Sequence, residues 1–340
     1  MSIDSLKEDL KTKKFKSLYL FYGPEEYLKK YYLESMENAL LQEDLKSLNK
    51  VVLEGKITTG TIIDHCETLP VFSDKKLVVV KNSGLFKAKG KGGQEGKGRT
   101  AKDDFLDYLA NVPDHTCLVF YEEEIDKRMK AVDSVKKKGL IVEFLYQKPA
   151  ELVKWVSKAF KSNKKDIDPM TASQLVENCE QGMTEILNEI NKLVLYTGER
   201  TKITGADIEK VCTKSVKSRI FDLTDAISEK NAAKALNLLE DMVILKEPMP
   251  KVLFMITRQF RQILEMKLLC GSGMRQDEAA SKIGITPFAA GKIQKQSNGF
   301  SVETLKQAVE ECLELDMAIK TGRMDDRIAA ELLITRYSQK

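Results

Sequence analysis

The chain has 340 residues, more than one hydrophobic core usually supports, and 42% of them are hydrophobic, so we expect two or three globular domains. Its 55 basic and 51 acidic residues give a net charge of +4, which excludes a strongly polycationic nucleic-acid binder. No apolar run reaches the ~20 residues of a membrane-spanning helix, and no signal-peptide pattern is present. We therefore expect a soluble protein of the cytoplasm that does not bind a membrane.

The first 146 residues alternate short apolar runs with segments of helical periodicity, which is typical of an α/β domain with a parallel sheet. The segment from Glu25 to Leu41 has one apolar stripe at helical spacing, so it predicts a helix that packs on the sheet. The predicted strands are Leu18–Tyr22, Val51–Leu53, Leu77–Val80, Cys117–Tyr121 and Leu140–Phe144.

Gln147-Lys148-Pro149 interrupts this alternation, and proline disfavours helix in the residue before it. We place a domain boundary there, so that the α/β domain covers residues 1–146. After the boundary the pattern predicts helices and no further strands. A small helical domain is expected at 147–214 and an all-helical domain at 215–340.

The first predicted strand ends where an α/β NTPase keeps its phosphate loop, G-x-x-x-x-G-K-[ST]. Gly23 fits the first glycine and Lys29 fits the lysine, but Leu28 replaces the second glycine and Lys30 replaces the hydroxyl. The pair Glu25–Glu26 adds negative charge where phosphates would lie, although it suits the start of a helix. The segment is therefore interpreted as a degenerate phosphate loop that does not bind ATP.

The strand Cys117–Tyr121 ends in Glu122 and Glu123, superficially like the acids that hold magnesium in NTPases. Without a phosphate loop these acids have nothing to act on, and we interpret them as solvent contacts.

The segment at 87–102 carries five lysines, one arginine and five glycines with almost no apolar residue. The like charges repel one another and the glycines leave the backbone conformationally free, so the segment cannot be part of a hydrophobic core. We therefore expect a surface loop. Transient contact with nucleic-acid phosphates stays open as an alternative.

The connection before the third strand contains three large apolar residues, Leu69, Val71 and Phe72, which loops rarely carry. They either tuck under the sheet as a satellite core or protrude as a plug for a partner's pocket. Pro70 stiffens the segment and so slightly favours the plug.

A helical hairpin at 276–296 has the alanine and glycine spacing of a DNA-reading helix-turn-helix. Its second helix opens with apolar and small residues and offers no side chain that reads base edges before Lys292 and Gln294. This favours an ordinary helical hairpin over sequence-specific DNA recognition.

Catalytic, cofactor and metal signatures are absent from the sequence. Neither His65 nor His115 has a plausible nucleophile beside it in sequence, and the six cysteines never approach C-x-x-C spacing. We expect reduced thiols, no metal, no cofactor and no catalytic residue.

Six segments in this order resemble the delta subunits of bacterial DNA polymerase III, which belong to the sliding-clamp loader. They are LYLFYGPEEYL at 18–28, LPVFSDKKLVVVKN at 69–82, CLVFYEEEIDKRMK at 117–130, IFDLTDAI at 220–227, ITRQFRQIL at 256–264 and DMAIKTGRMD at 316–325. The resemblance covers nearly the whole chain, and it depends on the order and spacing of the segments.

The resemblance implies an AAA+-type fold that has lost its phosphate loop, a three-helix lid and an all-helical collar domain that joins the other loader subunits. The family's clamp-contacting pair falls on Val71 and Phe72, with Leu69 just upstream. Valine stands where leucine is frequent, which removes about one methylene, or ~0.8 kcal/mol of burial.

The implied function is that of a non-catalytic subunit that binds and opens the beta sliding clamp for loading on primed DNA. Its implied partners are that clamp, the gamma/tau and delta-prime subunits, and primer-template DNA through the assembled complex. The enzyme it would serve is a DNA-directed DNA polymerase, a nucleotidyltransferase. Two alternatives stay open: an active AAA+ ATPase with an eroded phosphate loop, and a helix-turn-helix DNA-binding regulator.

Overall fold

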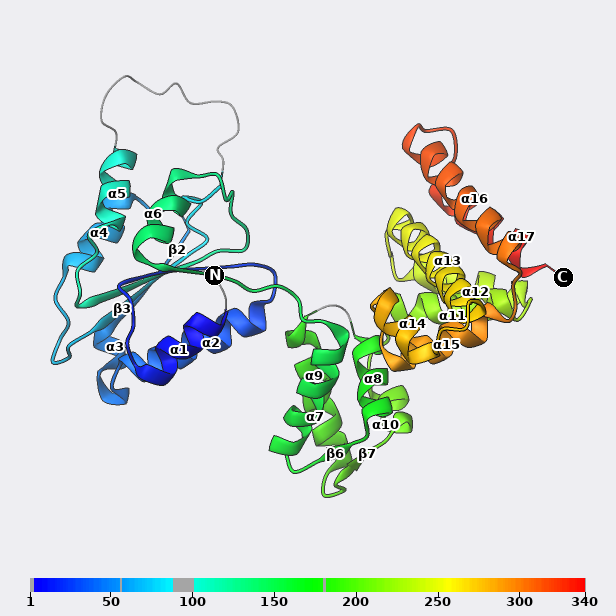
Figure 1. Ribbon diagram of the computed structural model, residues 1–340, viewed down its shortest axis with the longest axis horizontal. Coiled ribbons are helices and arrows are strands. Elements are labelled where there is room, and N and C mark those ends of the chain that lie inside the picture. The colour runs from blue at the N-terminus through cyan, green and yellow to red at the C-terminus, as the bar shows by residue number, and fades with distance from the viewer. Residues whose placement is uncertain (1–2, 56, 88–100, 180–181, 340) are drawn as a thin grey trace. The chain divides into compact units, whose positions relative to one another are not determined.

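The computed structural model describes residues 3–55, 57–87, 101–179 and 182–339. The chain forms two compact units, Met1–Tyr146 and Gln147–Lys340 (Figure 1). The predicted division of the second unit between residues 214 and 215 stays a prediction. The basic segment at 87–102 falls almost wholly on residues outside the described ranges.

The first unit contains a five-stranded parallel sheet in the order β2-β3-β4-β1-β5. Strands β1, β3 and β4 lie inside the sheet and are buried along nearly their whole length, which explains their continuous apolar runs. All five predicted strands are present. They are β1 (Leu18–Tyr22), β2 (Lys50–Glu54), β3 (Lys76–Lys81), β4 (Thr116–Tyr121) and β5 (Leu140–Glu143).

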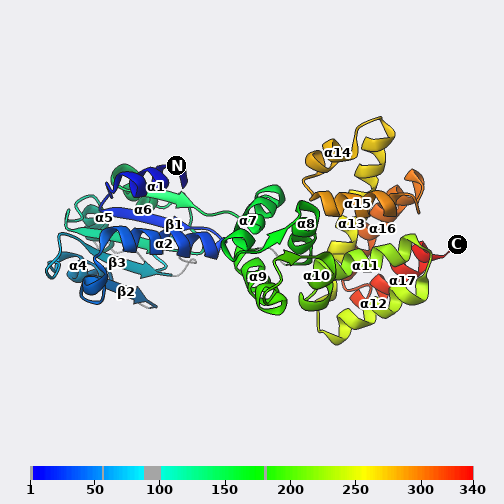
Figure 2. The ribbon, with the colours of Figure 1, turned by 90° about the horizontal axis from the view of Figure 1, so that it is seen from below.

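Helices cover both faces of this sheet, so the first unit has three layers (Figure 1, Figure 2). Helices α1 (Ile3–Thr12) and α2 (Glu26–Leu40) pack on one face, where Tyr32 and Met36 are buried against β1 and β3. Helices α4 (Thr59–Glu67), α5 (Ala101–Leu109) and α6 (Lys130–Lys138) pack on the other. A short 3-10 turn, η1 (Glu43–Leu45), and helix α3 (Lys46–Asn49) lead into β2.

The second unit is almost wholly helical. Its helices are α7 (Pro149–Ser162), α8 (Pro169–Asn178), α9 (Met183–Thr197), α10 (Gly205–Val211), α11 (Val216–Ser228), α12 (Ala232–Ile244), α13 (Met249–Gly271), α14 (Gln276–Ile283), α15 (Pro287–Ser297), α16 (Val302–Lys320) and α17 (Asp326–Ser338). One extended core joins α11 to α17, and the 23-residue helix α13 contributes buried side chains along its whole length.

The prediction that strands stop after Pro149 is wrong. Two-residue strands β6 (Asp166–Ile167) and β7 (Lys202–Ile203) pair in parallel beside α7 and α10. A strand of two residues is too short to show alternation or an apolar run, so only the pairing of distant segments reveals it. No helix in the described part of the chain is long and apolar enough to cross a membrane.

Candidate functional site

The connection between α4 and β3 carries three exposed apolar residues at the amino edge of the sheet, where the chain enters the strands. Leu69 is 71% exposed, Val71 40% and Phe72 88%. A phenylalanine packed under the sheet would be buried, so the satellite-core alternative does not describe this loop. We call Leu69–Phe72 the apolar loop.

Asn49, the last residue of α3, holds this loop in place through hydrogen bonds of its side chain. Its buried side chain accepts a hydrogen bond from the Val71 backbone N–H at 2.7 Å and donates one to the Val71 carbonyl at 2.9 Å. The same amide also donates to the Leu45 carbonyl at 3.2 Å. Both backbone polar groups of Val71 are therefore satisfied, as they would be beside a neighbouring strand.

Lys76 holds the other side of the connection, at the start of β3. Its buried ammonium group donates to the carbonyls of His65 at 2.6 Å and Thr68 at 2.9 Å, which lie at the end of α4. Burial lowers the pKa of Lys76. The last carbonyls of a helix need external donors, and here one lysine supplies two of them.

Phe72 has a φ of 51°, in the left-handed region that non-glycine residues rarely adopt. Such a conformation costs about 1–3 kcal/mol and persists only where the surroundings determine it. Asn49 and Lys76 supply those surroundings on the two sides of the loop. The exposed phenylalanine is thus displayed by a loop whose conformation is held in place.

The degenerate phosphate loop lies at the opposite, carboxyl edge of the sheet. Gly23 has a φ of 119°, and a side chain there would collide with the carbonyl group of Phe144. Its N–H donates to the Glu123 carbonyl at 3.0 Å, and the Glu25 N–H donates to the Phe144 carbonyl at 3.0 Å. A phosphate loop needs such N–H groups free to point at phosphate, and these two are used inside the fold.

The start of α2 is also capped from within the chain. Glu25 is buried at the N-cap position, and its carboxylate accepts from the Tyr27 N–H at 3.3 Å. A carboxylate at a helix N-terminus satisfies the dipole that an anion would otherwise meet. This end of α2 is therefore unsuited to phosphate.

Lys29 is only 2% exposed, although it stands where an NTPase keeps its phosphate-binding lysine. Its ammonium group donates to the Glu122 carbonyl at 3.1 Å, lies 3.0 Å from a Glu26 oxygen and stands 4.7 Å from the centre of the Tyr121 ring. The charge of Lys29 is thus neutralised inside the unit.

Leu28 and Lys30, the two residues that depart from the phosphate-loop pattern, also make their contacts within the unit. Leu28 packs against the core between α2 and the sheet, where a glycine would leave space for phosphate. Lys30 has a largely exposed side chain and lies 3.9 Å from Glu34, one helical turn later. The four predicted positions Gly23, Leu28, Lys29 and Lys30 lie at this edge, where the Gly23 N–H and the Lys29 ammonium group are bonded within the unit. The interpretation of the segment as a degenerate phosphate loop stays a prediction.

The interpretation of Glu122 as a solvent contact is wrong. Its side chain is 1% exposed, and it accepts hydrogen bonds from the Ser83 N–H at 2.9 Å and from the Ser83 hydroxyl. Burial raises the pKa of Glu122 despite these bonds. The loop that follows β3 covers Glu122, and the sequence around the end of β4 carries no sign of that cover. Glu123 is exposed, as expected.

The helical hairpin is formed by α14 and α15, but its second helix begins against another helix of the second unit. The Thr286 hydroxyl donates to a buried Glu177 oxygen of α8 at 2.8 Å, and the Phe288 N–H donates to the Ser173 hydroxyl of α8 at 3.2 Å. The first turn of a recognition helix must be free to enter the major groove. This geometry favours the ordinary helical hairpin.

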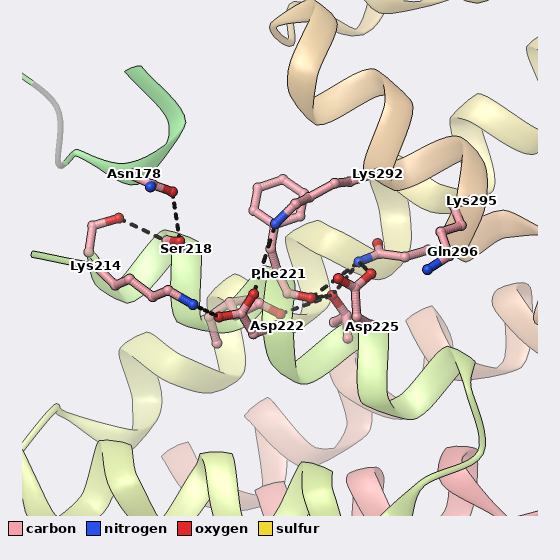
Figure 3. A network of polar contacts seen from close by, with 12 residues as sticks. Asn178, Lys214, Ser218, Phe221, Asp222, Asp225, Lys292, Lys295 and Gln296 are labelled. Atoms are coloured by element: carbon pink, nitrogen blue, oxygen red, sulfur yellow. Dashed lines mark hydrogen bonds and ion pairs between the residues drawn. The ribbon is translucent and has the colours of Figure 1, made fainter. Parts of the chain in front are cut away.

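Figure 3 shows how the rest of α15 is used in packing. Gln296 donates to Asp225 of α11 at 2.7 Å and to the Phe221 carbonyl at 3.2 Å. Lys292 lies above the Phe221 ring at 5.8 Å and 3.9 Å from Asp222. Gln296 and Lys292 of this helix therefore contact α11.

Within the described residues, no group of histidine, cysteine, aspartate and glutamate side chains could hold a metal ion. Sequence reasoning found the apolar loop but missed Asn49 and Lys76, which determine its conformation. Asn49 directly precedes β2, and Lys76 is the first residue of β3. Their partners in the connection between α4 and β3 and at the end of α4 lie 8 to 22 residues away, so no local pattern identifies them.

The chain is similar to known proteins over nearly its whole length. Residues 19–145 match the model of the DNA polymerase III delta subunit, and residues 217–337 match the model of the C-terminal domain of the same subunit. The chain is 26% identical over 335 residues to the DNA polymerase III subunit delta of Bacillus subtilis, covering 98% of this chain and 96% of that one. It is 21% identical over 332 residues to a probable subunit delta of Aquifex aeolicus, covering 95% and 92%.

A solved structure, the clamp loader delta protein of Bacillus subtilis, matches with a TM-score of 0.51 and 24% identity, covering 99% of this chain and all of that one. The predicted fold class, a parallel α/β domain followed by a helix-rich region, is confirmed. Both family models belong to one subunit and lie in the expected order along the chain. The chain is a member of the DNA polymerase III delta subunit family, a component of the clamp loader.

Proposed function

We propose that this chain binds a beta sliding clamp through the apolar loop and opens it for loading on primed DNA. The observation that carries the proposal is Phe72, an 88% exposed phenylalanine on a loop held by Asn49 and Lys76. Exposed aromatic residues on a preformed surface are typical of interface hot spots. Leu69 and Val71 extend the apolar surface on either side of Pro70.

A rigid loop suits the opening of a ring. A ligand shifts a conformational equilibrium only by its difference in affinity for the two states, so the subunit must bind the open clamp more tightly than the closed one. A flexible loop would adapt to both states and lose that difference. The hydrogen bonds to both polar groups of Val71 oppose such adaptation.

The proposed subunit is not itself an enzyme. The N–H groups of Gly23 and Glu25 and the ammonium group of Lys29 bond within the unit, which supports the loss of ATP binding. It would act with gamma/tau and delta-prime subunits, and it would meet primer-template DNA through the assembled complex. ATP-dependent work would then take place in those other subunits.

The direct test is titration of the full chain against the sliding clamp of the same organism, for the natural protein and for Phe72→Ala. Truncation of a buried interface aromatic costs about 2–4 kcal/mol, so clamp affinity should fall roughly 30-fold or more. The melting temperature should not change, because Phe72 is exposed in the free chain. Phe254→Ala is the matched control, since Phe254 is 67% exposed in the second unit and should leave clamp affinity unchanged. Unchanged affinity for Phe72→Ala would refute the apolar loop as the clamp contact.

Calorimetric titration with Mg-ATP separates the proposal from the ATPase alternative. We expect no binding heat, because the phosphate-facing groups of Gly23, Glu25 and Lys29 are already used. Micromolar affinity together with phosphate release would favour the active ATPase instead.

A further inference from the structure

The amino edge of the sheet carries a group of lysines beside the apolar loop. In a parallel sheet the segments that enter each strand lie at one edge, so the chain before β1, β3 and β5 meets there. We call these lysines the lysine edge. They are Lys11, Lys13, Lys14, Lys16, Lys75, Lys136, Lys137 and Lys138.

We propose that the lysine edge is a second contact surface for the same partner that receives Phe72, and that it binds carboxylate side chains on an acidic surface of that protein. The inference rests on the proposed function, because it takes the sliding clamp as the partner.

The positive charge of the lysine edge is not balanced inside the unit. Among the described residues, no ion pair joins any of these lysines to an acid, whereas Lys46, Lys50 and Lys127 of the same unit each pair with a glutamate. The Lys75 ammonium group donates to the backbone carbonyl of Asp114, which orients it without neutralising it. Seven of the eight lysines are exposed, so their charge is available to a partner.

Two hollows at this edge bring the separate segments together. One has a volume of about 380 Å³ and is lined by Lys16, Lys75 and Lys138 with Asp114. The other, of about 190 Å³, lies between the Lys13–Phe15 segment and the end of the apolar connection at Ser73–Lys75. The three lysines come from three segments, two loops and the end of α6, and they line one hollow, where a carboxylate can contact them. The second hollow connects this surface to the apolar loop.

The lysine edge lies close to the apolar loop, so both surfaces should contact the same partner. Lys75 follows Phe72 by three residues, so their Cα atoms lie within about 11 Å at full extension. A standard interface buries ~800 Å² on each side, a patch roughly 30 Å across. A protein that receives Phe72 therefore also covers Lys75 and the hollow beside it. This favours an acidic protein surface over DNA as the occupant.

Exposed charges of this kind chiefly raise the rate of association and make it depend on salt, because each single surface pair contributes little. The apolar loop and the lysine edge then have separate effects. Phe72 should govern how long the complex lasts, and the lysines should govern how fast it forms.

The test uses the full chain with Lys16→Gln, Lys75→Gln and Lys138→Gln combined, and measures association with the sliding clamp by stopped flow at about 50 and 300 mM salt. We expect an association rate about tenfold lower at low salt, a flatter dependence on salt and a nearly unchanged dissociation rate. The control Lys158→Gln, Lys161→Gln, Lys164→Gln makes the same charge change on exposed lysines of the second unit and should alter neither rate. If the Lys75 change lowers the melting temperature, Lys13→Gln, Lys16→Gln and Lys138→Gln test the same surface without it.

Other outcomes separate this inference from the proposed function. An unchanged association rate and salt dependence, with Phe72→Ala still weakening the complex, would overturn the lysine edge and leave clamp binding intact. Weaker binding to duplex DNA with unchanged clamp kinetics would assign the lysines to nucleic acid and overturn it as well. If the natural chain binds no clamp at any salt concentration, the proposed function fails and the inference fails with it.

Discussion

At the carboxyl edge of the sheet in the first unit, Lys29 and Glu122 are buried and bonded to neighbouring groups, whereas at the amino edge Phe72 and a row of lysines are exposed. In open α/β sheets the carboxyl edge is the usual place for ligands. Here the lysine at that edge is bonded within the unit, whereas the exposed phenylalanine and lysines of the opposite edge are available to a partner. Under the proposed function, the interaction surface therefore lies at the opposite end of the strands from the usual ligand site.

The largest effect on stability and on clamp affinity together is expected from a change at Asn49. Asn49→Ala removes both hydrogen bonds to Val71 and leaves buried polar groups unpaired, which costs about 1–3 kcal/mol. We expect a lower melting temperature together with clamp affinity reduced by about an order of magnitude, because the displayed conformation of Phe72 loses its support. Asn111→Ala, at an exposed asparagine, is the control for both measurements. Full clamp affinity in a destabilised Asn49→Ala protein would mean that the loop needs no rigid support.

A smaller effect, confined to stability, is expected at the carboxyl edge. Lys29→Met leaves the Glu122 carbonyl and Glu26 without their cation, so the free energy of unfolding should fall by about 1–3 kcal/mol. Clamp affinity per folded molecule should stay unchanged, since Lys29 is remote from the apolar loop in the sheet. Lys30→Met, on the exposed face of the same helix, should change neither quantity. Loss of an ATP-dependent activity in Lys29→Met would restore a catalytic role to this edge.

The smallest effect is expected at Glu122, where the stability difference should depend on pH. Burial raises the pKa of Glu122, so the folded chain binds its proton more tightly than the unfolded chain does. The ionised group therefore destabilises the protein at neutral pH, and this penalty is relieved as the pH falls toward the ordinary glutamate pKa. Glu122→Gln should be more stable than the natural chain at pH 7–8, by on the order of 1 °C in melting temperature, with the difference shrinking near pH 4.5. If the difference in melting temperature between Glu122→Gln and the natural chain grows as the pH falls, the pKa of Glu122 is not raised.

Much of the fold could be predicted because its signals are local. The runs at Leu18–Tyr22 and Cys117–Tyr121 are apolar throughout, as buried parallel strands must be, and β1 and β4 lie there. Helix α16 (Val302–Lys320) begins directly after Ser301, whose side chain accepts a hydrogen bond from the Thr304 N–H, so its start coincides with a local N-cap signal. Strands β6 and β7 were missed because two residues carry no periodicity, and only their pairing defines them.

The sequence by itself shows that two positions of the phosphate-loop pattern are replaced, since Leu28 and Lys30 stand where that pattern has a glycine and a hydroxyl. It also determined that three apolar residues stand in one loop. Whether Phe72 points outward or inward was open, because a loop's direction depends on partners distant in sequence. Only the tertiary structure decided this, through Asn49 at 22 residues' separation, and it also buried Glu122 and gathered lysines from three segments at one edge. Such juxtapositions follow from the parallel order of the strands, which brings together residues that no local pattern connects.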